Sequence, residues 1–201
     1  MKESKISREA PTKDAREALG RLRDENALLR AALAEARAQL SELEQMPGSD
    51  PLTALVDARQ FHAELSRVLS GCTRHNSHAA LLTVEIDDLK SINERYGRVA
   101  GDATLRDAAR LLRGLIRGSD VAARNGAATF SLLLDRLDAD SAIDTADRIG
   151  RCIAAHRIDL GSTEIKVRAT VSAATILPGD TVEEVVRRAA RNHARLKEME
   201  V

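Results

Sequence analysis

The segment DVAARNGAATFSLLL, residues 120–134, has the outline of a site that could present a loop to a phosphate. Two apolar, strand-like runs flank a short turn at residues 125–129, a pattern that favours a β-hairpin. The turn carries one glycine and neither a carboxylate nor a lysine, so it lacks the side chains that usually hold metal ions and phosphates. It is therefore either a catalytic hairpin that has lost its chemistry or a hairpin that never had any.

The composition narrows the class of protein to which this hairpin belongs. The 31 basic and 31 acidic side chains cancel, so charge gives no reason to expect binding to a nucleic acid polymer or to a membrane. One tyrosine and two phenylalanines imply an aliphatic core and little surface for stacking of bases. The two cysteines lack CxxC spacing, and there is neither a signal-peptide pattern nor an apolar run near the ~20 residues of a membrane span. These features predict a cytoplasmic protein.

A heptad pattern occupies residues 13–46, after a polar stretch at 1–12 that is predicted to be disordered. Asn26 at an a position favours a parallel two-stranded coil, because a buried amide needs a matching amide across the seam. We therefore predict a dimerisation helix of roughly 50 Å, the alternative being a helix packed on its own domain. The a positions are Leu19, Asn26, Leu33 and Leu40, and the d positions are Ala15, Leu22, Leu29, Ala36 and Leu43.

Residues 47–201 are predicted to form one globular domain after the break at Pro47 and Gly48. The expected fold class is α/β of the α+β kind, with a mainly antiparallel central sheet flanked by helices. Asp50 or Ser49 is expected to cap the first helix of this domain, and Asp180 or Thr181 the last. The expected helices lie at 52–69, 87–97, 101–118, 139–156 and 180–200, and the expected strands at 79–86, within 120–134 and at 164–176.

Four segments of this domain resemble, in order and spacing, the motifs of the GGDEF family of diguanylate cyclases. DPLTALVDARQF resembles DPLTGLPNRRxF, and VEIDDLKSINERYGRVAGDATL resembles DIDxFKxINDxxGHxxGDxxL. RGSDVAARNGAATF resembles RxxDxxxRxGGDEF, and RATVSAATI resembles xTVSIGVA. Several blocks in the right order are far more specific than a single short motif. The resemblance covers residues 50–198 and implies a nucleotidyl-cyclase-like fold.

The resemblance also implies the family's chemistry, in which two domains each hold one GTP and join the two into cyclic di-GMP. Two divalent metal ions, usually Mg²⁺, are held by the first Asp of DIDxFK and by the third residue of GGDEF, and they stabilise charge that builds up on the phosphate oxygens. Here Glu85 takes the first position and Ala128 the second. We therefore expect no catalytic residue in this loop, no Mg²⁺ cofactor, and at most a weak metal contact at Glu85. The degenerate loop is Gly126, Ala127, Ala128, Thr129 and Phe130.

Part of the family's GTP pocket is retained in the sequence. Asn93 and Asp102 match the residues that recognise guanine in the family, and Lys90 and Lys197 match two of its lysines. An amide and a carboxylate suit the hydrogen-bonding edge of guanine. Alternatively, Asn93 is a turn residue, Asp102 is a helix N-cap, and both lysines are ordinary solvated side chains.

A second family site, through which the product inhibits active members, is better preserved. The RxxD motif that precedes the hairpin is Arg117 to Asp120, at the family's distance of six residues from Gly126, and Arg148 falls at the position of a second arginine. Guanidinium groups bind phosphate and the O6/N7 edge of guanine, and a carboxylate accepts from guanine N–H groups. The alternative is a surface ion pair of little energetic value.

Three hypotheses about function follow. The first is an inactive GGDEF-like domain, dimerised by its coiled coil, that binds cyclic di-GMP through Arg117, Asp120 and Arg148 and signals to a protein partner. The second is a nucleotide-free scaffold that pairs with a signalling partner. The third is a weak cyclase that holds one metal ion with Glu85 and water.

Overall fold

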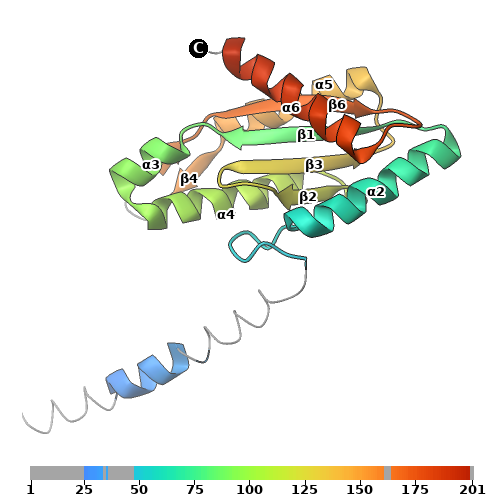
Figure 1. Cartoon of the computed structure of the whole chain (residues 1–201). Helices are drawn as coiled ribbons and strands as arrows, with labels where there is room; N and C mark the ends of the chain where they lie inside the picture. Colours follow the sequence, from blue (N-terminus) through green and yellow to red (C-terminus); the bar gives the residue numbers. More distant parts are fainter. Residues whose placement is uncertain (1–24, 34, 36–47, 161–163, 200–201) are drawn as a thin grey trace, which may run out of the picture. The chain divides into compact units, whose positions relative to one another are not determined.

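The computed structural model describes residues 25–33, 35, 48–160 and 164–199 (Figure 1). The chain divides into two compact units, Met1–Gln45 and Met46–Val201. The predicted disorder of residues 1–12, and most of the coiled coil predicted for residues 13–46, lie outside the described residues.

The described part of the first unit is α-helical over residues 25–33 and at residue 35. Leu29 and Leu33, at consecutive d and a positions of the heptad, are 64% and 51% exposed. Two leucines on one stripe of a helix form an apolar seam that a second helix would cover. The coiled coil and the homodimer stay predictions, and these two side chains are the place to test them.

The second unit is built on a four-stranded antiparallel sheet with the strand order β2-β3-β1-β6. The strands are β1 (Ala79–Ile86), β2 (Val121–Arg124), β3 (Thr129–Asp135) and β6 (Ala169–Ile176). β1 pairs with β3 along one edge and with β6 along the other, so it is a central strand. The predicted antiparallel α+β fold is confirmed, and so is the predicted strand at 79–86.

Two layers of helices cover the sheet (Figure 1). α4 (Arg98–Leu115) and α5 (Ala139–Ala155) pack on one face, and α2 (Ala58–His75) and α6 (Val182–Met199) pack on the other. The period-two alternation of β1 explains this division, because successive side chains point to opposite faces. The residues of β1 on the first face are Ala80, Leu82, Val84 and Ile86, and those in the core on the second are Ala79 and Leu81.

The first helix of the domain begins later than predicted. α2 starts at Ala58, and its N-cap is Asp57, whose carboxylate accepts from the backbone N–H of Gln60 (2.7 Å). Neither Asp50 nor Ser49 caps it. Asp50 instead accepts from the N–H and hydroxyl groups of Thr53 and pairs with Arg124. That prediction was wrong because the partner of Asp50 comes from a strand more than seventy residues away, and local sequence does not reveal it.

The strand predicted for residues 164–176 is two strands. β5 (Glu164–Lys166) pairs with β4 (Arg157–Asp159), which was not predicted, and β6 begins at Ala169. Arg168 lies at the break, where its backbone N–H and guanidinium donate to Asp88 and its carbonyl accepts from the N–H of Asp87 (3.0 Å). These contacts hold the chain at the end of β1 and turn it between β5 and β6. The alternation of inward and outward side chains continues through the turn, so the sequence pattern predicted one continuous strand.

Two other helix ends bear on the site. The closing helix, α6, is preceded by a capping box in which Thr181 and Glu184 each accept from the other's backbone N–H, so the predicted cap at Thr181 is confirmed. α4 begins at Arg98 rather than at 101, so Asp102 lies inside the helix and is not its N-cap. No helix in the described part of the chain is both long and apolar enough to cross a membrane.

The exposed heptad leucines carry a testable prediction about assembly. Replacing Leu29 and Leu33 together by lysine puts charges on the predicted seam, and we expect the chain to become monomeric. Light scattering coupled to size-exclusion chromatography measures the mass directly. Leu28 is the matched control, because it is 73% exposed on the same helix but lies at a c position. Leu28→Lys is expected to leave the mass unchanged, and a monomeric unmodified chain would contradict the coiled coil.

Candidate functional site: the polar end of the sheet beneath α6

The sheet face beneath α6 changes from apolar to polar partway along the strands. On β1 the change comes after Leu81, and the next residues on this face are Thr83 and Glu85. The strands on either side change at the same level, where the residues opposite Thr83 and Glu85 are Ser131, Thr129, Ser172 and Thr170. A row of short hydroxyl side chains with one carboxylate therefore faces the C-terminal half of α6.

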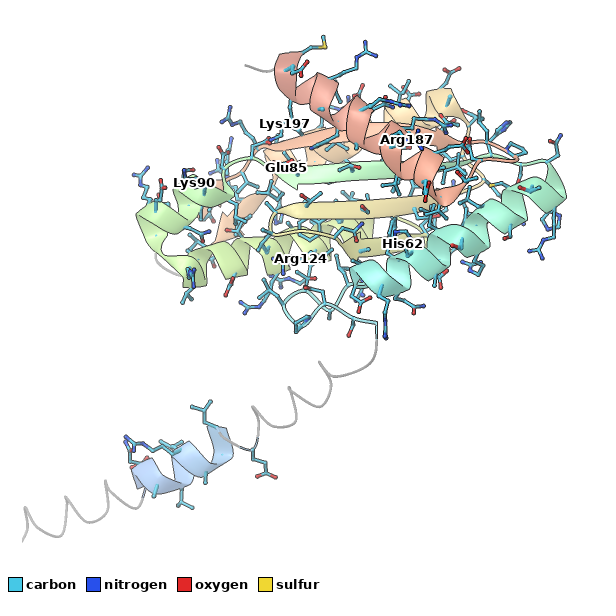
Figure 2. The ribbon with its side chains drawn as sticks, viewed as in Figure 1. His62, Glu85, Lys90, Arg124, Arg187 and Lys197 are labelled. Carbon is cyan, nitrogen blue, oxygen red and sulfur yellow. The ribbon has the colours of Figure 1, made fainter. Side chains whose placement is uncertain are left out.

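Glu85 lies at the centre of a hydrogen-bonded cluster with α6. Its Oε2 lies 2.9 Å from Nε2 of His193, and its Oε1 lies 3.1 Å from Nζ of Lys197. The same ammonium group donates to Oδ1 of Asp87 at 2.6 Å, and Asp87 also accepts from the hydroxyl of Thr170 at 3.0 Å. Figure 2 shows Lys197 on α6 close to Glu85 on β1. Both carboxylate oxygens of Glu85 thus already have partners from the protein.

The charges in this cluster stabilise one another. Burial raises the pKa of Glu85, but the hydrogen bonds from His193 and Lys197 outweigh it, so the net pKa lies below the usual value. The pKa of Lys197 is raised, mainly by its hydrogen bond to Asp87 and against the effect of burial. Glu85 is therefore ionised and Lys197 protonated at neutral pH.

These residues do not fit the pair of metal ions that the family motif implies. Ala128 offers no ligand where GGDEF has a carboxylate, and Thr129, opposite Glu85, offers only a hydroxyl. Glu85 directs both oxygens at nitrogen donors. Within residues 25–33, 35, 48–160 and 164–199, no three His, Cys, Asp or Glu side chains are grouped so that they could hold a metal ion. We derive no step of chemistry through a metal here.

The hairpin keeps its shape without the missing acids. The N–H of Asn125 donates to the carbonyl of Thr129 (3.0 Å), and the N–H of Ile86 donates to the carbonyl of Ala128 (3.0 Å). Arg124 donates to the carbonyl of Ala127 (2.8 Å) and forms an ion pair with Asp50 at 3.2 Å. These hydrogen bonds to residues 127 and 128 and to Thr129 use backbone atoms, so the turn needs no carboxylate to keep its shape, and the Ala128 side chain packs against the core.

Ser172, His193 and Glu85 form a chain that superficially resembles a hydrolytic triad. The hydroxyl of Ser172 lies 3.1 Å from Nδ1 of His193, whose other ring nitrogen faces Glu85. Ser172 is only 2% exposed, however, so a substrate carbonyl could not approach its oxygen. The arrangement holds α6 on the sheet and is not a nucleophilic site.

The remaining residues of the predicted GTP pocket lie on α3 (Leu89–Tyr96) and α4. Asn93 packs against Gly101 so closely that a Cβ at Gly101 would lie 1.9 Å from Oδ1 of Asn93. Asp102 follows on α4 and is exposed. Lys90 is exposed and 4.0 Å from Glu94, and it lies apart from Lys197 (Figure 2). Asn93 therefore lies next to the first helical turns of α4, which carry Asp102. Lys197 lies elsewhere, paired with the carboxylates at the end of β1.

Arg117, Asp120 and Arg148 meet at a different place, around a cavity of about 80 Å³ between the end of α4, the start of β2 and α5. Asp120 accepts from the backbone N–H groups of Arg117 (2.9 Å) and Asp135 (3.3 Å). The Arg148 guanidinium donates to the carbonyl of Leu115 at 3.4 Å. Asp120 therefore fixes the loop, while the Arg117 and Arg148 side chains are exposed.

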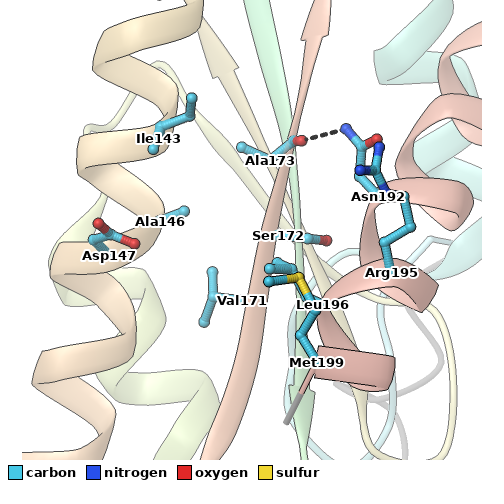
Figure 3. A pocket seen from close by; sticks show the side chains of 10 residues that line it. All are labelled: Ile143, Ala146, Asp147, Val171, Ser172, Ala173, Asn192, Arg195, Leu196 and Met199. Atoms are coloured by element: carbon cyan, nitrogen blue, oxygen red, sulfur yellow. Dashed lines mark hydrogen bonds between the residues drawn. The ribbon is translucent and has the colours of Figure 1, made fainter.

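A second cavity, of about 300 Å³, lies beside the edge strand β6 between α5 and α6 (Figure 3). Its lining is mainly apolar and includes Ile143, Val171 and Leu196. The side-chain amide of Asn192 donates to the carbonyl of Ala173 (2.8 Å) and so covers part of the strand edge. None of the residues that the sequence singled out lines this cavity.

Sequence reasoning missed two members of the Glu85 cluster, His193 and Asp87. A signal was present for His193, because positions four apart on a helix share a face, and His193 is four residues before Lys197. For Asp87 the signal was its place two residues after Glu85, on the same side of the extended chain. Neither signal indicates that α6 lies over β1.

With the fold and the sites described, the relationship to known proteins is clear. The family model described as "Diguanylate cyclase, GGDEF domain" matches residues 48–200. The chain belongs to the GGDEF family.

Individual relatives agree. The probable diguanylate cyclase DgcC of Escherichia coli K12 is 31% identical over 136 residues, which are 68% of this chain and 36% of DgcC. The diguanylate cyclase TpbB of Pseudomonas aeruginosa is 33% identical over 163 residues, 75% of this chain and 37% of TpbB. The chain thus spans little more than a third of the length of these relatives.

Two solved structures match in fold. The GGDEF domain of TpbB from P. aeruginosa has a TM-score of 0.71 at 31% identity, over 75% of this chain and 89% of that one. The coiled coil and GGDEF domain of DgcB from Caulobacter crescentus, in complex with cyclic di-GMP, has a TM-score of 0.72 at 23% identity, over 89% of this chain and 95% of that one.

The Glu85 cluster predicts a pH-dependent contribution to stability. A carboxyl group whose pKa is lower in the folded chain stabilises it above its unfolded pKa, and this contribution is lost as the pH falls through the folded pKa. We expect Glu85→Gln to lower the free energy of unfolding by about 1–2 kcal/mol at neutral pH, because Lys197 and His193 lose a charged partner.

Urea unfolding of both proteins across a pH series tests this expectation. The difference between them is expected to shrink as the pH falls below the usual carboxyl value of 4.5. Glu94→Gln is the matched control, since Glu94 contacts only an exposed lysine at 4.0 Å, and it is expected to have almost no effect. A difference that is independent of pH would show that Glu85 acts through packing and not through its charge.

Proposed function

We propose that this domain binds cyclic di-GMP through Arg117, Asp120 and Arg148 and does not synthesise it. The observation that carries the proposal is that these three residues, two from the loop between α4 and β2 and one from the middle of α5, line one cavity. The hairpin loop that carries carboxylates in GGDEF offers none here. Together these two observations favour binding of the nucleotide over its synthesis.

The charges at this cavity suit a guanine-containing dianion. Exposed guanidinium groups can bind phosphate oxygens and the O6/N7 edge of guanine, and Asp120 supplies carboxylate oxygens for guanine N–H groups. A neighbouring hollow of about 320 Å³ shares Arg117 and Asp120 and adds Arg113. A ligand with two guanines would lie across both hollows, with Arg117 between them. The DgcB structure, of the same fold, is in complex with cyclic di-GMP, which supports this choice of ligand.

The proposal includes the route by which binding becomes a signal. Cyclic di-GMP bound at Arg117 would bridge or reorient the two domains of a homodimer formed by residues 13–46. That change would then pass along the helical segment to a protein partner.

Calorimetric titration with cyclic di-GMP tests the binding site. We expect micromolar or tighter binding to the unmodified chain, and at least about tenfold weaker binding to Arg117→Ala and Arg148→Ala, since each loses charged hydrogen bonds. Arg151→Ala is the matched control, because Arg151 is exposed one turn further along α5 and does not line the cavity. Unchanged affinity in the first two variants would contradict the assignment of the site. If titration of the unmodified chain released or absorbed no heat, the nucleotide-free scaffold would be favoured.

An activity assay tests the second half of the proposal. Incubation with GTP and Mg²⁺ or Mn²⁺ is expected to yield no cyclic di-GMP by chromatography. Loss of a metal-binding carboxylate removes several kcal/mol of transition-state stabilisation, or about three orders of magnitude in rate. Product that forms with the unmodified chain and disappears in Glu85→Ala would instead establish the weak cyclase.

A further inference from the structure

The carboxylates of Glu85 and Asp87 share a cation that the chain itself supplies. The Lys197 ammonium group lies 3.1 Å from Oε1 of Glu85 and 2.6 Å from Oδ1 of Asp87. It thus lies between two carboxylates that are two residues apart in the sequence and belong to the motif which, by its resemblance to DIDxFK, contributes a metal ligand.

We propose that the ammonium group of Lys197 is a built-in substitute for a divalent cation: it occupies the point on which the Glu85 and Asp87 carboxylates converge and offsets part of their charge without metal. The inference goes beyond the proposed function, because it concerns a different site and does not depend on whether cyclic di-GMP binds at Arg117.

The geometry favours an internal cation over a dissolved one. The ammonium group has three N–H donors, and acceptor oxygens of Glu85 and Asp87 lie within reach of them. Val185 and Ala189 pack α6 against the core, so Lys197 approaches from a helix that is already anchored. A divalent ion would have to displace a tethered charge and also compete with His193 for the second oxygen of Glu85.

An ordinary surface ion pair would differ in one respect that can be measured. Removing its lysine would leave solvated carboxylates with no particular affinity for metal, whereas removing Lys197 leaves two carboxylates aimed at one point.

The test uses Mn²⁺ as the probe and Lys197→Met as the variant in the full chain. We expect the unmodified chain to show no Mn²⁺ binding by calorimetry and no change in thermal unfolding with Mn²⁺. Lys197→Met is expected to bind Mn²⁺ at least about tenfold more tightly than the unmodified chain and to unfold at a higher temperature when Mn²⁺ is present. Adding Glu85→Gln to Lys197→Met is expected to abolish the gain.

Lys90→Met is the matched control, because Lys90 contacts a single exposed carboxylate and its loss is expected to create no site for Mn²⁺. Lys197→Gln keeps a hydrogen-bond donor without the charge, and it replaces Lys197→Met if that variant does not fold. Mn²⁺ binding to the unmodified chain as tight as to the variant overturns the proposal, and so does a folded variant without Mn²⁺ binding. Neither result bears on the titration with cyclic di-GMP.

Discussion

The structure depends on β1, a central strand that is paired along both edges and apolar for most of its length, and that nevertheless carries a carboxylate next to its last residue. Ala80, Leu82 and Val84 are fully buried, and Glu85 follows them directly. Glu85 is half-buried, and an ionised carboxylate there is unfavourable unless other groups donate hydrogen bonds to it. α6 meets this requirement with Lys197 and His193, one turn apart on one helix face. Apolar packing through Val185 and Ala189 anchors the closing helix, and the contacts to Glu85 fix its C-terminal half over the end of β1.

The hairpin keeps its shape without a carboxylate in its turn. Its shape rests on backbone hydrogen bonds to β1 and across the turn, and on the ion pair of Arg124 with Asp50. Side chains at 127–129 take no part in these contacts. The small residues at those positions fit this turn, with Ala128 packed on the core, and they offer no carboxylate to a metal ion.

The two candidate sites differ in whether their charged side chains are paired within the chain or exposed. At the end of β1 the charged groups face one another, and both oxygens of Glu85 are taken by Lys197 and His193. At the junction of α4, β2 and α5, Asp120 is used by backbone N–H groups, and the arginines Arg117 and Arg148 are left exposed. A site whose charges are satisfied within the chain contributes to stability, whereas exposed guanidinium groups around a hollow are available to an anion.

Much of the fold and part of the candidate site could be predicted from the sequence, because motifs and the pattern of apolar and polar residues are local features. The order of the blocks predicted the family, the apolar runs predicted β1 and the hairpin, and the loop GAATF showed the absence of a carboxylate. The RxxD spacing also indicated Arg117 and Asp120, but their common cavity with Arg148 became visible only in the fold.

The sequence by itself determined the family, the antiparallel α+β architecture and the residue types available for chemistry, since each is encoded in short stretches. Only the tertiary structure decided that Lys197 and His193 neutralise Glu85, that Asp50 serves Arg124 and not the cap of α2, and that Arg168 divides the strand predicted for 164–176. The physical reason is the same in each case. These contacts join residues some seventy or more positions apart, and which charges meet is settled by the packing of helices on the sheet.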